Sequence, residues 1–321
     1  VSHWRVCQGK TGPLGTKSEH TKLVKPIIKQ YTNQSKIVTK SFPGVLFMHR
    51  LVRVPSRVNI IGEHTDYAGG LALPFTIDNY LQLEIIPHDS DFIGDETVVR
   101  LWQAVGGYPA ELVVNSNIPI GKGMSSSAAL CVAVVVGMMP DLEKMEICLH
   151  AQRLEHEILG TKCGLLDQMA MVFGRKNHAS LINFTDLSVD YIAMPKSWRF
   201  KLVDSRIHRK LADIDYQSND DYRSEHLVTE NQRVTDALSS DAEHLGVLLN
   251  QSHHSLMKLG VSHPEVDEMV KNLQLTHGVF GARMMGGGYG GMILVLVESD
   301  KILPSGLTVS STGTFSFEEF S

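Results

Sequence analysis

The stretch Arg57-Val58-Asn59-Ile60-Ile61-Gly62-Glu63-His64-Thr65-Asp66-Tyr67-Ala68-Gly69-Gly70 carries the clearest structural signal in this chain of 321 residues. It begins with a β-branched, apolar segment typical of a strand and ends in Gly69-Gly70, which is typical of a turn. Between them lies a dense set of hydrogen-bonding side chains that includes Glu63, His64 and Asp66. Carboxylates and an imidazole at the end of a strand suit a ligand rich in hydroxyl groups, so we interpret this stretch as part of a binding site.

Two other interpretations of the same stretch stay open. The first is a metal site at Glu63, His64 and Asp66, but a single histidine without a second one at helical spacing is a poor set for a transition metal. The second is a polar turn in which Asp66 hydrogen-bonds its own backbone.

Outward from this stretch, the sequence predicts strands mixed with helices. Strands are expected at 57–61, 71–77, 81–86, 112–117, 180–184, 200–204 and 292–297. Helices are expected over the apolar run 128–139, over 141–159, along the leucine-rich segment 245–259, and after a capping box formed by Ser262 and Glu265. Because strands and helices do not alternate regularly, we predict an α+β protein of two domains, 1–198 and 199–321.

Composition and charge exclude several classes of protein. The 30 basic and 35 acidic residues give a net charge of −5, and no run of lysine and arginine suits a nucleic acid. The longest apolar run is shorter than the roughly 20 residues that cross a bilayer, and the first residues show no apolar signal segment. We therefore expect a cytoplasmic protein with reduced thiols at Cys7, Cys131, Cys148 and Cys163, which form no Cys-x-x-Cys pair.

A second segment, Pro119-Ile120-Gly121-Lys122-Gly123-Met124-Ser125-Ser126-Ser127-Ala128-Ala129, predicts an anion site. Glycines allow a ligand to approach the backbone, and the following helix presents free N–H groups and the positive end of its dipole. A nucleotide phosphate is the natural ligand, although no Gly-x-x-x-x-Gly-Lys-Ser/Thr motif is present. The alternative is an apolar core helix capped by serine.

Two acidic residues stand beside apolar segments. Asp167, in Cys163-Gly164-Leu165-Leu166-Asp167-Gln168, precedes an apolar helix and is expected to be partly buried, where a carboxylate needs a cationic partner or a chemical role. Its alternative role is that of a helix cap. Glu155 flanks the apolar seam of the helix at 141–159 and is otherwise an ordinary solvated glutamate.

The glycines Gly286, Gly288 and Gly291 match the pattern G-x-G-x-x-G of dinucleotide-binding proteins. That pattern must follow a strand and open a helix, whereas here it follows a helical segment and precedes the strand at 292–297. We therefore predict a tight turn with close backbone packing and no dinucleotide site.

Taken together and in this order, these segments resemble those of the galactokinases, within the GHMP superfamily of small-molecule kinases. The resemblance runs from about residue 50 to 300. It implies an N-terminal domain like domain 2 of ribosomal protein S5, a ferredoxin-like C-terminal domain, and a site between them. It also implies transfer of the γ-phosphoryl group of ATP, with Mg²⁺, to the anomeric hydroxyl of galactose.

The resemblance further implies a role for each matching position. Asp167 is the expected catalytic base, and Arg57 is its charge-stabilising partner. Mg²⁺ is expected on Ser127 and Glu155. The expected sugar contacts are Glu63, His64, Asp66, Gly164 and Tyr216, and the expected phosphate-loop residues are Gly121, Gly123, Ser125, Ser126 and Ser127.

Three departures from the family pattern leave alternatives open. Met285 replaces a threonine, Leu259-Gly260 replaces an Asp-Tyr pair, and the stretch 87–111 is short, with Trp102 as a neighbour to consider for adenine. The alternatives are a kinase for N-acetylgalactosamine or an acidic sugar, and a non-catalytic sensor of galactose and ATP that binds a regulatory protein.

Overall fold

The structure is a computed structural model that describes residues 48–207 and 220–320. The strands are β1 (His49–Asn59), β2 (Leu71–Ala72), β3 (Pro74–Pro87), β4 (Ile93–Gly94), β5 (Ala110–Ser116), β6 (His178–Asn183), β7 (Ser188–Ala193), β8 (Arg199–Asp204), β9 (Val279–Met284), β10 (Met292–Val297), β11 (Leu307–Thr308) and β12 (Ser316–Phe320). The α-helices are α2 (Glu96–Ala104), α3 (Ser126–Met138), α4 (Lys144–Glu157), α5 (Leu166–Val172), α6 (Asp220–Ala237), α7 (Ala242–Leu259) and α8 (Pro264–Gln274), and η1 (Asp66–Ala68) is a short 3-10 helix. Among these residues, no helix is both long and apolar enough to cross a membrane.

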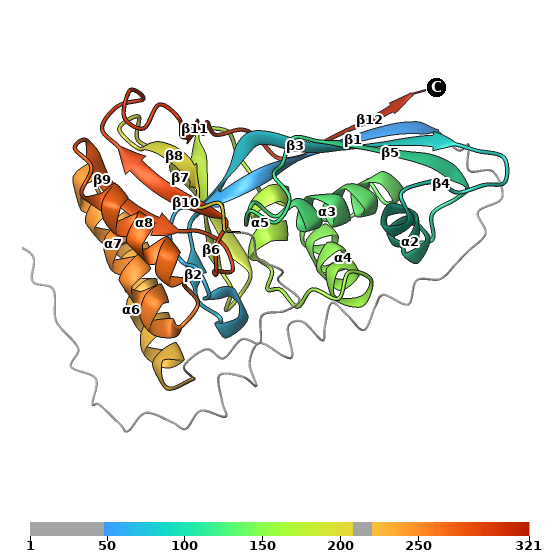
Figure 1. The fold of residues 1–321 in the computed structure, drawn as a ribbon. Coiled ribbons are helices and arrows are strands. Elements are labelled where there is room, and N and C mark those ends of the chain that lie inside the picture. Colours follow the sequence, from blue (N-terminus) through green and yellow to red (C-terminus); the bar gives the residue numbers. More distant parts are fainter. Residues whose placement is uncertain (1–47, 208–219, 321) are drawn as a thin grey trace, which may run out of the picture. The chain divides into compact units, whose positions relative to one another are not determined.

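The first sheet has the strand order β12-β1-β3-β5-β4, and helices α2 to α5 lie on one of its faces (Figure 1). Helix α3 contacts β1 and β3 on one side and α4 on the other. Its run of alanine, valine and cysteine is almost wholly buried, because the sheet and the neighbouring helices cover it on most sides. The apolar run at 128–139 is therefore a core helix, as predicted.

Strand β3 corrects one expectation. The sequence predicted two strands, at 71–77 and 81–86, with Asp78 and Asn79 between them, but the structure has one strand over Pro74–Pro87. Its pairing with β1 shifts register between Pro55 and Ser56, which lie opposite Tyr80 and Ile77. A β-bulge thus accommodates the two polar residues without ending the strand.

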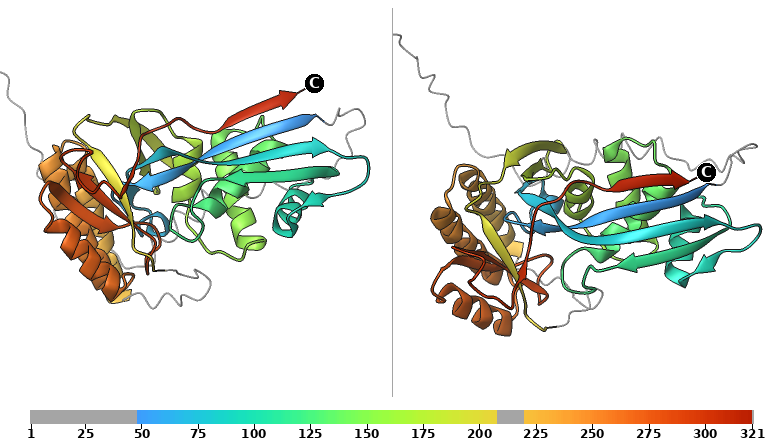
Figure 2. Two further views of the ribbon diagram at one scale, coloured as in Figure 1. Left: turned by 45° about the horizontal axis from the view of Figure 1, so that its top comes forward. Right: turned by 90° about the horizontal axis from the view of Figure 1, so that it is seen from above.

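The second sheet has the strand order β11-β8-β10-β9. Helices α7 and α8 contact β9, and α6 contacts α7, as the two views of Figure 2 also show. A smaller hydrophobic cluster lies between these elements and includes Leu256, Val266 and Val295. Helix α8 begins at Pro264, but its N-cap is His263, whose ring nitrogen accepts the N–H of Glu265. The predicted capping box at Ser262 is therefore wrong, because the Ser262 hydroxyl donates to Asp267 instead.

The last strand returns to the first sheet. β12 pairs antiparallel with β1, with Leu51 opposite Glu318. The expected boundary at residues 198 and 199 assigns this segment to the C-terminal domain, whereas its hydrogen bonds join it to the N-terminal sheet. A third, small sheet in the order β2-β6-β7 lies next to the 57–70 stretch, since β2 follows Gly70 directly.

Candidate active site

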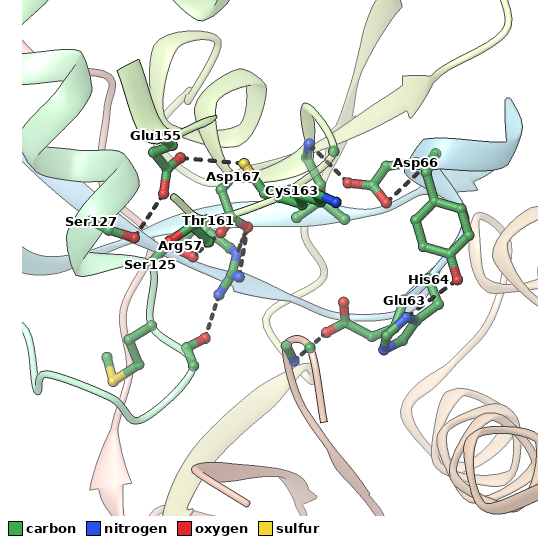
Figure 3. Close-up of a pocket in the computed structure, with 18 of the residues that line it drawn as sticks. Arg57, Glu63, His64, Asp66, Ser125, Ser127, Glu155, Thr161, Cys163 and Asp167 are labelled. Carbon is green, nitrogen blue, oxygen red and sulfur yellow. Dashed lines mark hydrogen bonds and ion pairs between the residues drawn. The ribbon is translucent and has the colours of Figure 1, made fainter. Parts of the chain in front are cut away.

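One cavity of about 400 Å³ collects the residues that the sequence singled out. Its lining includes every predicted site residue except Tyr216, which lies outside the described residues. The predicted residues that line it are Arg57, Glu63, His64, Asp66, Gly121, Gly123, Ser125, Ser126, Ser127, Glu155, Gly164 and Asp167. Figure 3 shows how residues from β1, α3, α4 and α5 meet there.

An arginine and an aspartate form an ion pair in this cavity. Nε and Nη2 of Arg57, on β1, lie 2.8 and 2.6 Å from Oδ1 of Asp167, in the first turn of α5. The arginine side chain is 4% exposed and the aspartate side chain 27% exposed, so the carboxylate faces the cavity while its partner is buried. Ser125 donates its hydroxyl to Oδ2 of the same carboxylate. Asp167 is thus oriented by two partners and is not the N-cap, which is Leu165.

The serine segment forms the N-terminus of α3 against this pair. Ser125 is the N-cap residue and adopts a left-handed conformation with φ 59°. Its hydroxyl is bonded to Asp167, and no side chain among the described residues caps α3. The first N–H groups of a thirteen-residue helix therefore point toward the cavity edge without a side-chain acceptor, which suits an anion.

Ser127 and Glu155 form a second polar pair beside the first. The Ser127 hydroxyl donates to Oε1 of Glu155 at 2.7 Å, and the amide of Gln168 donates to Oε2. Glu155 is 2% exposed. Burial, and next the negative charge of Asp167, raise the pKa of Glu155 to about 7. A cation at this position would favour the ionised carboxylate.

Glu63 connects the 57–70 stretch to the glycine cluster. Its Oε1 accepts the backbone N–H of Gly286 at 2.7 Å and lies 3.3 Å from Nη2 of Arg283. Although burial opposes ionisation, the charges of Arg283 and Arg57 and the Gly286 N–H hold the pKa of Glu63 below its usual range. Arg283 is fully buried and also donates to the carbonyls of Asn59 and Ile60.

Asp66 and Gly164 are in close contact across the cavity. Asp66 accepts backbone N–H groups from Tyr67 at 3.1 Å and from Leu166 at 3.4 Å. Burial, and next the charge of Asp167, raise the pKa of Asp66 to about 6. A Cβ atom added to Gly164 would lie 1.9 Å from Oδ2 of Asp66, so a larger residue at this position would displace the Asp66 carboxyl group. His64 completes this wall, with its Nδ1 3.3 Å from the Tyr67 hydroxyl.

None of the residues at the family departures is among those that line the cavity. Met285 is fully buried in the hydrophobic core, and Leu259 is fully buried at the end of α7. Gly260 ends that helix in a left-handed conformation with φ 80°. Trp102, which the sequence offered only as a neighbour to consider for adenine, is also a core residue. It donates its indole N–H to the carbonyl of Tyr108 and is not among the residues that line the cavity.

Sequence reasoning missed Arg283 and the polar side chains of α6. His226 lies 2.9 Å from the carbonyl of Glu63, Glu230 accepts the N–H of Gly62 at 3.0 Å, and Asn231 accepts the N–H of Leu71 at 2.8 Å. His226 and Glu230 are fully buried. The only signal for Arg283 was a lone arginine in the apolar strand Val279–Met284, where a charge needs partners.

Comparison with known families agrees with this geometry. The family of the GHMP kinases N terminal domain matches residues 95–175, and that of the GHMP kinases C terminal matches residues 234–303. These two domain matches, together with the helices and sheets described above, confirm the α+β fold expected from the sequence. The galactokinase galactose-binding signature matches residues 43–84.

Individual relatives show which GHMP kinases this chain is similar to. Galactokinase of Thermotoga maritima is 32% identical over 309 residues, which cover 76% of this chain and 88% of the relative. Galactokinase of Roseiflexus is 31% identical, and the match covers 79% of this chain and 85% of the relative.

Solved structures show the same fold. A crystal structure of Lactococcus lactis galactokinase complexed with galactose matches with a TM-score of 0.73 at 20% identity, covering 92% of this chain and 99% of that one. Mevalonate kinase of Methanococcus jannaschii is similar with a TM-score of 0.63 at 20% identity, covering 83% and 99%. This chain is a GHMP kinase and belongs to the galactokinase family.

Proposed function

We propose that this chain transfers the γ-phosphoryl group of ATP to the anomeric hydroxyl of galactose, with Asp167 as the general base. The observation that carries the proposal is the Asp167 carboxylate, which is held by Arg57 and Ser125 between the galactose-binding signature and the serine segment. A base at this point reaches both a bound sugar and a bound phosphate.

The sugar would be recognised by the wall of the cavity made from the 57–70 stretch. Glu63, His64 and Asp66 line it, together with the Gly164 backbone. An ionised carboxylate accepts hydrogen bonds from hydroxyl groups, and these charge-assisted bonds are stronger than neutral ones. The low pKa of Glu63 supports its role as such an acceptor. Tyr216 stays a proposed contact from the sequence alone.

The phosphates would lie on the N-terminus of α3. Gly121 and Gly123 leave room for close approach, and Ser125, Ser126 and Ser127 bring hydroxyl and N–H donors. Phosphoryl transfer needs positioning and charge neutralisation more than covalent chemistry from the protein. Arg57 supplies a fixed positive charge next to the base, where it neutralises charge as the hydroxyl loses its proton.

Ser127 and Glu155 fit a Mg²⁺ ion by their chemistry. Both present oxygen atoms at the cavity, 2.7 Å apart, and Mg²⁺ is usually bound by one or two protein oxygens together with substrate phosphates and water. When bound, the ion neutralises charge on the phosphate oxygens. The use of ATP and the unpaired thiols of Cys131, Cys148 and Cys163 support a cytoplasmic location.

A panel of acceptors tests this function. Purified protein is incubated with ATP, Mg²⁺ and either galactose, N-acetylgalactosamine, galacturonate or glucose, and ADP release is recorded. We expect the highest kcat/KM with galactose. A preference for N-acetylgalactosamine or galacturonate would replace the substrate assignment, although Leu259 and Gly260, which suggested that alternative, do not line the cavity. Binding of galactose and ATP by folded protein without any turnover would favour the sensor.

A further inference from the structure

Lys122 lies in the middle of the predicted phosphate loop but faces away from the cavity. Gly121 and Gly123 on either side line the cavity, whereas Lys122 is not among the lining residues. Its side chain is 11% exposed, and its Nζ lies 2.9 Å from Oδ1 of Asp204 at the end of β8. A lysine between two glycines of such a loop would ordinarily be assigned to a phosphate, but here it is bonded to the C-terminal domain.

The backbone of Lys122 is bonded to the same sheet. Its carbonyl accepts the N–H of Met292, the first residue of β10, at 2.9 Å. Met292 and Asp204 are directly opposite each other in the antiparallel pairing of β10 with β8. Lys122 therefore contacts two neighbouring strands at one register position: its side chain contacts β8 and its carbonyl contacts β10. A Cβ atom at Gly291 would lie 2.6 Å from this carbonyl, so the close approach depends on glycine.

The next residue connects the loop to the catalytic pair. The carbonyl of Gly123 accepts a hydrogen bond of 2.7 Å from Nη1 of Arg57, the same guanidinium that binds Asp167. Two consecutive carbonyls of the loop thus accept hydrogen bonds from different parts of the protein. That of Lys122 is held by the C-terminal sheet, and that of Gly123 is held by the arginine of the active site.

We propose that Lys122 is a positioning residue that holds the phosphate loop on the C-terminal domain and does not bind phosphate. The proposal rests on the proposed function for its ATP site. Because the ammonium group is largely removed from water and paired with Asp204, turning it into the cavity would break a contact between the domains. Loss of the pair would let the loop move relative to Arg57 and would weaken ATP binding more than galactose binding.

The test compares Lys122→Met, Asp204→Asn, the double variant and the conservative Lys122→Arg. ATP affinity is measured by calorimetry, and KM for ATP and for galactose by ADP release. We expect both single substitutions to raise the Kd and KM for ATP by a similar factor, on the order of fivefold, with the double variant no worse than either single one. Lys122→Arg should stay within about twofold of the unsubstituted protein. Lys271→Met, at an exposed lysine on α8, is the matched control and should change neither constant.

A phosphate ligand would give a different pattern. If Lys122 binds ATP directly, Lys122→Met weakens ATP binding while Asp204→Asn, which releases the lysine, leaves it unchanged or improves it. That result, or no change in ATP affinity in either single variant, overturns the proposal. Absence of turnover in the unsubstituted protein would refute the proposed function, while the calorimetric comparison would still decide the role of Lys122.

Discussion

At the scale of single residues, the site depends on carboxylates whose surroundings differ sharply. Asp167 is paired with Arg57, Glu63 is held ionised by two arginines and a backbone N–H, and Asp66 and Glu155 have raised pKa values because burial and the charge of Asp167 oppose their ionisation. Three of these carboxyl groups, Glu63, Asp66 and Glu155, therefore differ in pKa, as expected where roles differ.

The role of Asp167 is tested by Asp167→Asn, which keeps the shape of the side chain but cannot accept a proton. We expect kcat to fall by at least about a hundredfold, the low end for a general base, in a variant that circular dichroism shows to be folded at the assay temperature. Asp190→Asn, at an exposed residue of β7, is the control and should keep full activity. A fall in kcat of less than about tenfold would remove Asp167 from the role of base.

The raised pKa of Asp66 predicts a pH-dependent cost to stability. Because the folded protein binds this proton more tightly than the unfolded chain, the contribution of Asp66 to the free energy of unfolding decreases as pH rises from about 4 toward about 6 and is level above that. Asp66→Asn should thus be more stable than the unsubstituted protein at pH 7.5, by about 1 kcal/mol after allowing for partial exposure. In urea titrations, the difference in unfolding free energy between Asp66→Asn and the unsubstituted protein should vanish near pH 4. Because Asp66 is a proposed sugar contact, the same substitution should also raise KM for galactose. A difference that does not vary with pH would contradict this explanation.

The described residues that the sequence proposed for the site come from local motifs, which is why they line one cavity. Arg57, Glu63, His64 and Asp66 belong to one continuous stretch, and all four line the cavity. Arg283 was missed because its partners, the carbonyls of Asn59 and Ile60, lie more than two hundred residues earlier in the chain. Burial of a charge by distant backbone atoms leaves no local pattern.

At the scale of elements, loops and helix ends bring the site together. Glycine-rich loops are predictable as turns, but their contacts are not. A Cβ at Gly288 would lie 2.0 Å from the carbonyl of Val261, and φ is +93° there. The chain after α7 thus packs directly on the glycine loop, a contact that the G-x-G-x-x-G pattern does not indicate.

Gly288→Ala should therefore destabilise the protein through both a clash and backbone strain. The control is Gly106→Ala, because Gly106 has a similar φ of +81° but open space around it. We expect the control to lose about 1 kcal/mol of unfolding free energy and Gly288→Ala to lose at least about 2 kcal/mol more, measured by urea denaturation. Equal losses in the two variants would show that the contact with Val261 contributes nothing.

Helix α6 shows how a polar helix can be a core element. Its sequence favours a solvated helix, yet Glu230 is fully buried and accepts hydrogen bonds from Gly62, Ser252 and Arg233. These partners come from three different parts of the chain, so helical periodicity alone does not predict the burial.

Glu230→Leu removes the acceptor of the Gly62 N–H, the Ser252 hydroxyl and Nε of Arg233, and leaves the Arg233 charge without its carboxylate. We expect the free energy of unfolding to fall by about 3–5 kcal/mol, and Glu230→Gln to lose less because its amide oxygen still accepts from Gly62. Glu225→Leu, at an exposed position on the same helix, should stay within about 0.5 kcal/mol. A loss below about 1 kcal/mol for Glu230→Leu would contradict the buried network.

At the scale of the whole molecule, the two sheets contribute different parts of one site. The first carries Arg57 and supports the serine segment, and the second brings Gly286 and Arg283 to Glu63. The sequence predicted the α+β class from its mixture of elements. It did not predict that β12 pairs with β1, because the pattern of a five-residue edge strand does not specify a partner about 265 residues away.

Identification of the reaction product is the sharpest test of the chemistry proposed for this combined site. Purified protein is mixed with ATP, Mg²⁺ and galactose, and the reaction is followed by phosphorus NMR. We predict one equivalent of galactose phosphorylated at the anomeric oxygen for each ADP formed, with no such product from the Asp167→Asn variant on the same timescale. A folded, ATP-binding protein that yields no sugar phosphate, or that phosphorylates galactose at another hydroxyl, would contradict the account.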